Sequence, residues 1–357
     1  MKTNKTTKVL TMLGASLLSV VSMAQSTSSK KQAVASSSII VTMADFNKAL
    51  SEDTSVKTRA VTFKKLNLKL AGMLYLPSDL DESKKYRAIV VVHPGGGIKE
   101  QTAGLYAYRL AQQGYVALAF DAAYQGASEG QPRGLEDPTS RVEDVRSAVD
   151  YISSLSFVDQ NKIGALGICA GGGYAVGATI TEHRIKAVAT VSAVDIGAGF
   201  RQGWRNTESV ATQIKTLEAV AKQRSAEANG SEAMLIPYVP DTTDKVTEPD
   251  MIEASEYYRL SNRWLHPNST NRLLFSSIDK IYAFSAFDRI GTLLTQPLLM
   301  IAGSEAGSKW HSEQGVKLAK GPKELFIVKG GTHMSLYDKD VVKTMPKIIE
   351  FFSKNIK

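Results

Sequence analysis

Cysteine is almost absent from this chain, since Cys169 is the only one among 357 residues. A single cysteine cannot form an internal disulfide, so the fold has to rest on its hydrophobic core. A lone thiol is either buried as a small apolar group or used for chemistry, and its sequence neighbours distinguish these two roles.

The sequence also lacks motifs for metals, phosphates and nucleotides. Its five histidines have no HExxH or related ligand spacing; they are His93, His183, His266, His311 and His333. No GK[ST] phosphate loop occurs, and a dinucleotide fingerprint that starts at Gly171 would need glycine where Val176 stands. We therefore expect no cofactor and no metal ion.

An excess of basic residues gives the chain a formal charge of +8, with 43 lysines and arginines against 35 acidic residues. These basic residues are scattered and form no stripe interleaved with aromatic side chains. Such a distribution is typical of a solvated surface, and we expect no nucleic-acid partner.

Long apolar runs are missing except near the N-terminus, where Lys2, Lys5 and Lys8 precede an apolar stretch from Val9 to Val21. That stretch of about 13 residues is shorter than a bilayer span. It leads to the small-residue site Ser22-Met23-Ala24. We predict a signal peptide over residues 1–24, a leader over 25–58 and export to the periplasm or the extracellular space. An uncleaved anchor is the alternative; after cleavage we expect no stable membrane insertion.

Short apolar runs, each followed by a loop, recur through the rest of the chain. They cover residues 88–92, 115–120, 162–168, 185–193, 297–303 and 323–329. Between them lie segments with helical spacing, one opened by a capping box at Ser140–Glu143. This alternation predicts a mostly parallel, doubly wound α/β sheet covered by helices on both faces. An antiparallel pair over residues 61–77, with Leu66, Leu68 and Leu70 on one side, should open the sheet.

This alternation of apolar runs and helical segments stops between residues 195 and 295. There the sequence is polar, has helical spacing and contains scattered aromatic residues. We interpret this stretch as a helical cap inserted into a core formed by residues 59–194 and 296–357. Its Tyr257, Tyr258 and Trp264 either line a pocket or pack the cap onto the core; Tyr258 is the candidate substrate-binding residue.

The strongest chemical signal is Gly167-Ile168-Cys169-Ala170-Gly171, a G-x-C-x-G pattern directly after an apolar strand. It is a nucleophile elbow, in which side chains at the two glycine positions would collide with backbone. We predict that Cys169 is a nucleophile and that the helix beginning at Ala170 lowers its pKa. A buried cysteine in a glycine-rich helix start is the alternative.

Such a nucleophile needs an oxyanion hole and a base. The amide of Ala170 should be one donor, and the second should come from His93-Pro94-Gly95-Gly96-Gly97, with Gly96 preferred and Gly95 next. The base should follow the last strand, which makes His333 the catalytic candidate.

The acid that orients His333 is less clearly marked, because the loop after residues 297–303 contains no aspartate. Glu305 is the carboxylate in that loop and is the predicted catalytic acid. Asp195, after the preceding core strand, is an alternative, and so is a Cys–His dyad without an acid.

Several stretches together resemble a known family. They are residues 93–97 with Lys99-Glu100-Gln101, Phe120-Asp121, residues 133–138, residues 167–173 and Gly331-Thr332-His333. With them the core resembles the dienelactone-hydrolase-like branch of the α/β hydrolases, in a group that includes polyketide acyltransferases. This resemblance implies an α/β-hydrolase fold and a Cys–acid–His triad acting on ester, lactone or thioester bonds of a small-molecule acyl substrate. Acyl transfer, or a noncatalytic ligand-binding scaffold of the same fold, are the alternatives.

Overall fold

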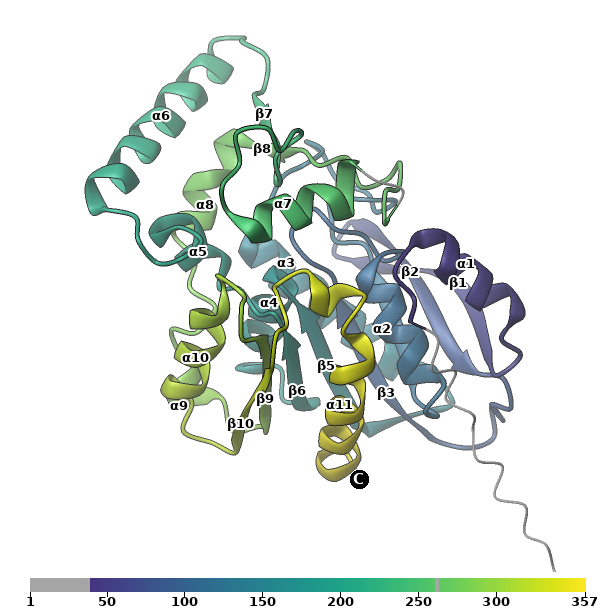
Figure 1. Cartoon of the computed structure of the whole chain (residues 1–357). Coiled ribbons are helices and arrows are strands. Elements are labelled where there is room, and N and C mark those ends of the chain that lie inside the picture. Colours follow the sequence, from purple (N-terminus) through teal and green to yellow (C-terminus); the bar gives the residue numbers. More distant parts are fainter. Residues whose placement is uncertain (1–38, 261–262) are drawn as a thin grey trace, which may run out of the picture. The chain divides into compact units, whose positions relative to one another are not determined.

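An eight-stranded sheet forms the centre of the computed structural model, which describes residues 39–260 and 263–357 (Figure 1). The predicted signal peptide lies outside the described residues. In spatial order the strands are β1 (Val56–Lys65), β2 (Leu68–Pro77), β4 (Val116–Phe120), β3 (Tyr86–Val92), β5 (Val158–Ile168), β6 (Ile185–Val191), β9 (Leu298–Gly303) and β10 (Lys323–Val328). Strand β2 is antiparallel to both of its neighbours, and all other neighbours are parallel. The predicted opening pair and parallel sheet are thus confirmed.

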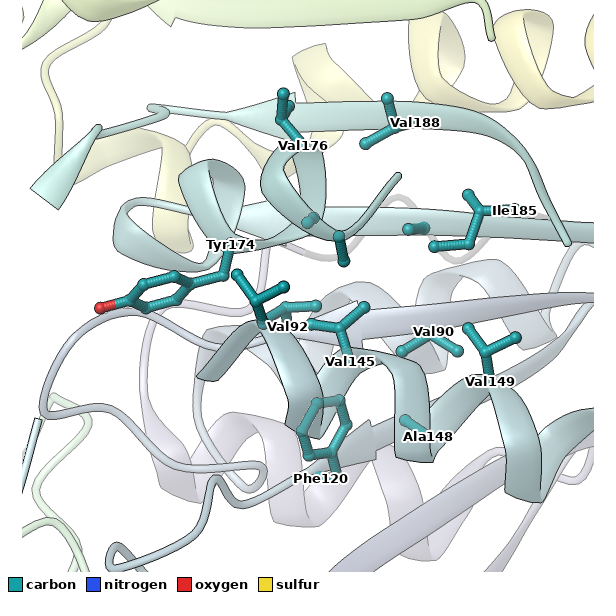
Figure 2. Packing of buried hydrophobic residues seen from close by; sticks show 14 of the residues in the cluster. Val90, Val92, Phe120, Val145, Ala148, Val149, Tyr174, Val176, Ile185 and Val188 are labelled. Carbon is teal, nitrogen blue, oxygen red and sulfur yellow. The ribbon is translucent and has the colours of Figure 1, made fainter. Parts of the chain in front are cut away.

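Helices cover both faces of this sheet. They are α2 (Thr102–Ala111) and α11 (Val341–Asn355) on one face, and α3 (Pro138–Ser153) and α4 (Ala170–Thr179) on the other, while α10 (Lys309–Leu318) lies between β9 and β10 in sequence. Alternate residues of β3 contact the helices on opposite faces of the sheet. Val90 and Val92 pack against α3 and α4 (Figure 2), whereas Ile89 and Val91 belong to the cluster with α2 and α11. Strands buried on both faces are why the sequence shows continuous apolar runs rather than alternation.

Folded structure begins earlier than expected, inside the predicted leader of residues 25–58. Helix α1 (Met43–Glu52) starts at a capping box in which Thr42 and Asp45 each bond the other's backbone amide. Its buried Phe46 packs against the rings of Tyr108 and Trp264. The leader prediction overlooked this capping signal, because the surrounding composition is rich in serine and lysine.

Two local details also differ from the sequence pattern. Leu66 lies in the turn between β1 and β2, with φ 51° and 82% exposure, so it does not share the inward side of Leu68 and Leu70. Helix α3 begins at Asp137, whose side chain accepts from the amides of Thr139 and Ser140, and not at the predicted capping box. Proline at the first position of this helix favours the earlier start.

Between β6 and β9 the predicted insertion is mostly helical. Its elements are α5 (Ile196–Gln202), α6 (Val210–Ala228), β7 (Leu235–Ile236), α7 (Pro249–Ser255), the π-helix η1 (Glu256–Leu260), β8 (Leu273–Leu274), the 3₁₀ turn η2 (Phe275–Ser277), α8 (Ile278–Tyr282) and α9 (Ile290–Leu293). Figure 1 shows α5, α6, α7 and α8 gathered at one end of the sheet. None of the helices in the described ranges has the length and apolar character needed to cross a membrane.

Candidate active site

Cys169 lies at the sharp turn between β5 and α4, with φ 55°, a conformation that few side chains adopt readily. A Cβ atom added to Gly167 would lie 2.2 Å from the carbonyl oxygen of Gly171, and one added to Gly171 would lie 2.3 Å from that of Val92. Both approaches are to backbone, which cannot move aside cheaply. The predicted nucleophile-elbow geometry, with its two required glycines, is confirmed.

Two backbone amides face the sulfur of Cys169, those of Ala170 and Gly95. Gly96, the preferred second donor in the sequence analysis, does not have this position. It adopts φ +69°, its carbonyl accepts from the Ser269 hydroxyl, and the ring of Tyr238 lies against its α-carbon. The candidate oxyanion hole is therefore formed by the amides of Ala170 and Gly95.

The loop after β3, which carries Gly95 and Gly96, is held in place by residues from the stretches that resemble the known family. The amide and the ammonium of Lys99 each lie 2.8 Å from the Asp121 carboxylate, and Glu100 pairs with the same ammonium at 2.5 Å. These bonds tie the loop after β3 to the end of β4. Glu136, fully buried, accepts from the Tyr238 hydroxyl at 2.6 Å and so fixes that ring over the loop. The stretches that carried the family resemblance thus act as supports of the candidate oxyanion hole.

His333 lies between β10 and the 3₁₀ turn η3 (Ser335–Tyr337), with 2% exposure. Its Nδ1 is 2.6 Å from the Ser308 hydroxyl, and its Nε2 is 3.1 Å from the Tyr337 hydroxyl. The same Tyr337 hydroxyl is in hydrogen-bonding reach of the Cys169 sulfur. No hydrogen bond among the described residues joins Cys169 directly to His333. Tyr337, which the sequence analysis did not single out, therefore connects the two predicted residues.

Burial sets the charge state of this pair. Burial raises the pKa of the Cys169 thiol, and bonds from Tyr337 and the two amides oppose it only in part. Burial also lowers the pKa of His333 to about 4, while the Asp250 carboxylate acts to raise it. The resting pair is a neutral thiol and a neutral imidazole at pH 7. The expectation of a lowered thiol pKa is wrong for this state, because desolvation outweighs the amides.

Neither predicted acid contacts His333. Glu305 is exposed, and its carboxylate accepts from the neighbouring Ser304 hydroxyl. Asp195 caps α5 and accepts from the amides of Ala198 and Ala286. The carboxylate that does contact the histidine is Asp250, from α7 of the insertion, 3.2 Å from the His333 amide nitrogen.

A cavity of about 320 Å³ opens above the Cys169 sulfur. Its apolar walls come largely from the insertion, with Ile196, Phe200, Trp204, Met251 and Tyr258, and in part from the core, with Val194. Neither lysine nor arginine is among the residues that line it.

The three aromatic residues predicted in the cap have two different roles. Tyr258 lines the cavity, whereas Tyr257 and Trp264 are completely buried and stack on each other with centroids 5.8 Å apart. Within residues 39–260 and 263–357, no cluster of histidine, cysteine and carboxylate side chains is suited to hold a metal ion.

The sheet order and the position of the elbow define an α/β-hydrolase fold, and solved structures that share it include α/β hydrolases. The chain belongs to the dienelactone hydrolase family, whose model matches residues 70–216.

Similar proteins extend over most of the chain. An uncharacterized protein, YcjY of Escherichia coli (strain K12), is 40% identical over 292 residues, which cover 81% of this chain and 95% of that protein. The acyltransferase drtE of Aspergillus calidoustus is 28% identical, over 82% of this chain and 96% of its own. The crystal structure of the hypothetical protein PA2218 from Pseudomonas aeruginosa superposes with a TM-score of 0.80 at 33% identity, covering 85% and 95% of the two chains.

Proposed function

We propose that this protein is an exported hydrolase that cleaves ester, lactone or thioester bonds through an acyl-enzyme on Cys169, with His333 as the base. One observation carries the proposal: the Cys169 sulfur lies at the floor of an apolar cavity, faces two backbone amides, and is one hydroxyl away from His333. A nucleophile, oxyanion donors and a base are thus within reach of one substrate carbonyl.

The hydrogen bonds around His333 suggest a route for the thiol proton. If Nδ1–H donates to the Ser308 hydroxyl, Nε2 is free to accept from the Tyr337 hydroxyl, whose oxygen can accept from the thiol. When a substrate carbonyl arrives, the thiol proton passes to the Tyr337 oxygen and the Tyr337 proton passes to Nε2. The result is a thiolate and an imidazolium, with Tyr337 neutral throughout.

The thiolate then attacks the carbonyl carbon, and the developing oxyanion accepts from the amides of Ala170 and Gly95. The imidazolium returns its proton to the leaving oxygen or sulfur, which leaves a thioester on Cys169. Water attacks this thioester while His333 takes its proton. Collapse releases the carboxylic acid, and the proton on His333 restores the thiol.

The cavity walls favour an uncharged acyl group. Without a lysine or arginine side chain in the lining, a substrate carboxylate or phosphate would lose its hydration and gain no charged partner there. A small apolar acyl chain would instead replace water against the side chains of Phe200, Met251 and their neighbours. We propose neutral esters, lactones and thioesters of such acids as the substrate class.

The test compares Cys169→Ala and His333→Ala with the unaltered protein on p-nitrophenyl esters of increasing acyl length. Loss of the nucleophile should lower kcat by several orders of magnitude, and intact-protein mass spectrometry should find an acyl adduct only where Cys169 is present. His183→Ala, at an exposed histidine, is the matched control for the base. Retained turnover in Cys169→Ala would overturn the proposal.

Acyl transfer is the second candidate, because aromatic side chains of the insertion, Phe200, Trp204 and Tyr258, line the cavity and give an organic acceptor an apolar surface to bind. A relative that is named an acyltransferase also supports it. Adding an alcohol or amine acceptor to a reacting ester distinguishes the two. In a transferase the acylated acceptor replaces the free acid, whereas in a hydrolase the yield of acid stays the same.

Export belongs to the same proposal and rests on the pattern of residues 1–24. Mass spectrometry of the exported protein should find Gln25 at its N-terminus. A secreted or periplasmic form that retains Met1 would contradict cleavage at this site.

A further inference from the structure

The loop after β9 is where the sequence places the acid, yet no carboxylate of that loop contacts His333. The loop backbone is nevertheless close to the histidine loop, since the Glu305 amide donates to the Gly331 carbonyl at 2.9 Å. Its one carboxylate, Glu305, is exposed and bonded to Ser304. The loop therefore has the right position and lacks the required side chain.

The space beside this loop is filled from the insertion. A Cβ atom added to Gly307 would lie 3.1 Å from Oδ2 of Asp250 and 2.8 Å from the ring of Trp204. The Trp204 ring and the Asp250 carboxylate together thus occupy the volume into which a side chain at position 307 would project. Gly307 has no left-handed φ that would require glycine, so its lack of a side chain is explained by this close approach.

Asp250 holds the surroundings of His333 at three points. Its Oδ1 accepts from the His333 amide at 3.2 Å, and its Oδ2 accepts from the Gly307 amide at 2.7 Å and from the Trp204 indole at 2.8 Å. Gly307 precedes Ser308, the partner of the His333 Nδ1, and the Trp204 ring packs edge-on against the imidazole at 4.8 Å. One carboxylate, 2% exposed, therefore fixes the backbone, the Nδ1 partner and the packing of the ring.

We propose that Asp250, on helix α7 of the insertion, is the positioning carboxylate of His333 and replaces an acid in the loop after β9. The proposal rests on the proposed function of Cys169 and His333, and it makes the insertion a part of the catalytic site. Both Asp250 and Trp204 are insertion residues, and α7 is joined to the Trp204 segment by the ion pair of Glu248 with Arg205, whose Nε lies 2.6 Å from the carboxylate. A proper histidine orientation then requires the insertion to be seated on the core.

The deciding experiment compares Asp250→Asn with Glu305→Gln, two changes that each remove one carboxylate and keep its shape. Asp250→Asn should lower kcat about 100-fold with KM changed less than about threefold, as expected for a group that orients the base. Its acid limb of kcat/KM should move to lower pH, because the lost negative charge no longer favours the imidazolium. The kcat of Glu305→Gln should stay within about twofold of that of the unaltered enzyme, and the acid limb of its kcat/KM profile should lie at the same pH.

Alkylation of Cys169 by iodoacetamide keeps this test separate from the proposed function. Asp250→Asn should still be labelled stoichiometrically, which shows an intact nucleophile. The inference is overturned if Glu305→Gln is the slower enzyme, if Asp250→Asn is within threefold of the unaltered protein, or if it is slow with an unmoved acid limb. These outcomes concern only the identity of the acid. The proposed acyl-enzyme on Cys169 is tested separately, by whether Cys169→Ala loses turnover and the acyl adduct.

A second pair of variants covers the case in which Asp250→Asn does not fold. Asp250→Ala removes the carboxylate beside Gly307, and adding Gly307→Asp supplies one from the core loop once the Trp204 ring, 2.8 Å from the new Cβ, shifts aside. We expect the double variant to be at least about tenfold faster than Asp250→Ala. A folded double variant that is no faster would overturn the placement of the acid.

Discussion

At the scale of single residues, Tyr337 is the side chain that connects Cys169 with His333, and in the proposed mechanism it passes the proton between them. Its hydroxyl is 3.1 Å from the imidazole and within reach of the sulfur, and its ring packs edge-on against Tyr257 at 5.4 Å. A hydrogen bond from this hydroxyl also lowers the pKa of the thiol and so favours the thiolate. A phenol with its pKa raised well above the ordinary value by burial stays protonated, as a relay group must.

Tyr337→Phe should therefore slow catalysis while leaving the packing of the ring intact. We expect kcat to fall about 10- to 100-fold with little change in KM, since proton-transfer groups contribute on that scale. Alkylation of Cys169 at a fixed pH should slow as well, because the thiol pKa rises when this donor is lost. Both rates can be measured on the same preparation.

Tyr106→Phe is the matched control for this change. Tyr106 is equally buried and donates to the Leu336 carbonyl, next to Tyr337 in the chain, but it does not line the cavity. It should cost about 1 kcal/mol of stability through the lost hydrogen bond and leave the alkylation rate unchanged. Equal alkylation rates in Tyr337→Phe and the unaltered protein would contradict the relay.

At the scale of elements, the sequence pattern was sufficient to predict a strand or turn wherever the residues that cause it are close together in the chain. The apolar runs at residues 88–92 and 162–168 correspond to β3 and β5, and the elbow follows from glycines two positions on either side of Cys169. The location of His333 in the loop after β10 likewise follows from its place after the last apolar run. In each case the constraint lies within a few residues, or in the order of strands along the chain.

The residues that sequence reasoning missed act across long separations. Asp250 contacts a histidine 83 positions later, and Ser308 contacts the same ring from 25 positions away. No local pattern marks either one, because insertion helices have no fixed register against the core. Position 307 carried the useful signal: a glycine in a loop where a carboxylate was expected indicates that another segment fills the space. Of the two glycines expected to supply the second donor, Gly96 was preferred and Gly95 faces the sulfur, because three consecutive glycines do not reveal which amide points toward it.

Helix α4 offers a test of how closely the elbow is packed, with two glycines that should respond in opposite directions. Gly171→Ala places a Cβ 2.3 Å from the backbone oxygen of Val92, which forces α4 away from β3. We expect a loss of about 3 kcal/mol or more, with reduced activity. Gly177→Ala meets the Val142 side chain at 3.4 Å, an ordinary contact, and should gain up to about 1 kcal/mol from helix propensity.

Chemical denaturation of both variants measures these changes directly. Equal stabilities for Gly171→Ala and Gly177→Ala would show that the backbone approach at the elbow is looser than described. A stabilised Gly177→Ala beside a damaged Gly171→Ala would support it, since the two substitutions are chemically identical and lie on the same helix.

At the scale of the whole molecule, the candidate active site and the fold depend on the same buried interior. Residues from both core segments and from the insertion meet around one cavity, and several titratable groups are enclosed with them. Three histidines, His93, His311 and His333, are held neutral by burial, which lowers their pKa values. Acid conditions therefore act on the stability of the molecule as well as on catalysis.

His311 in α10 offers a test of this effect, because neither ring nitrogen has a hydrogen-bond partner within the described residues and the ring stacks on Trp310 at 3.6 Å. Burial, and to a lesser extent the charge of the nearby His333, lowers the pKa of His311 to about 3, against about 6.5 in an unfolded chain. The stabilising contribution of the neutral ring is complete above pH 6.5 and is lost as the pH falls toward 3, since only the unfolded chain takes up the proton. At pH 5 this amounts to about 2 kcal/mol.

His311→Leu should remove this acid sensitivity while keeping a side chain of similar size in the core. Measured by denaturant unfolding, the stability of His311→Leu relative to the unaltered protein should improve by about 2 kcal/mol between pH 7.5 and pH 5. His183→Leu, which alters an exposed histidine, should follow the pH dependence of the unaltered protein. If His311→Leu also runs parallel to the unaltered protein over this range, the ring takes up its proton in the folded state, and the enclosed region around α10 is more accessible to water than its burial indicates.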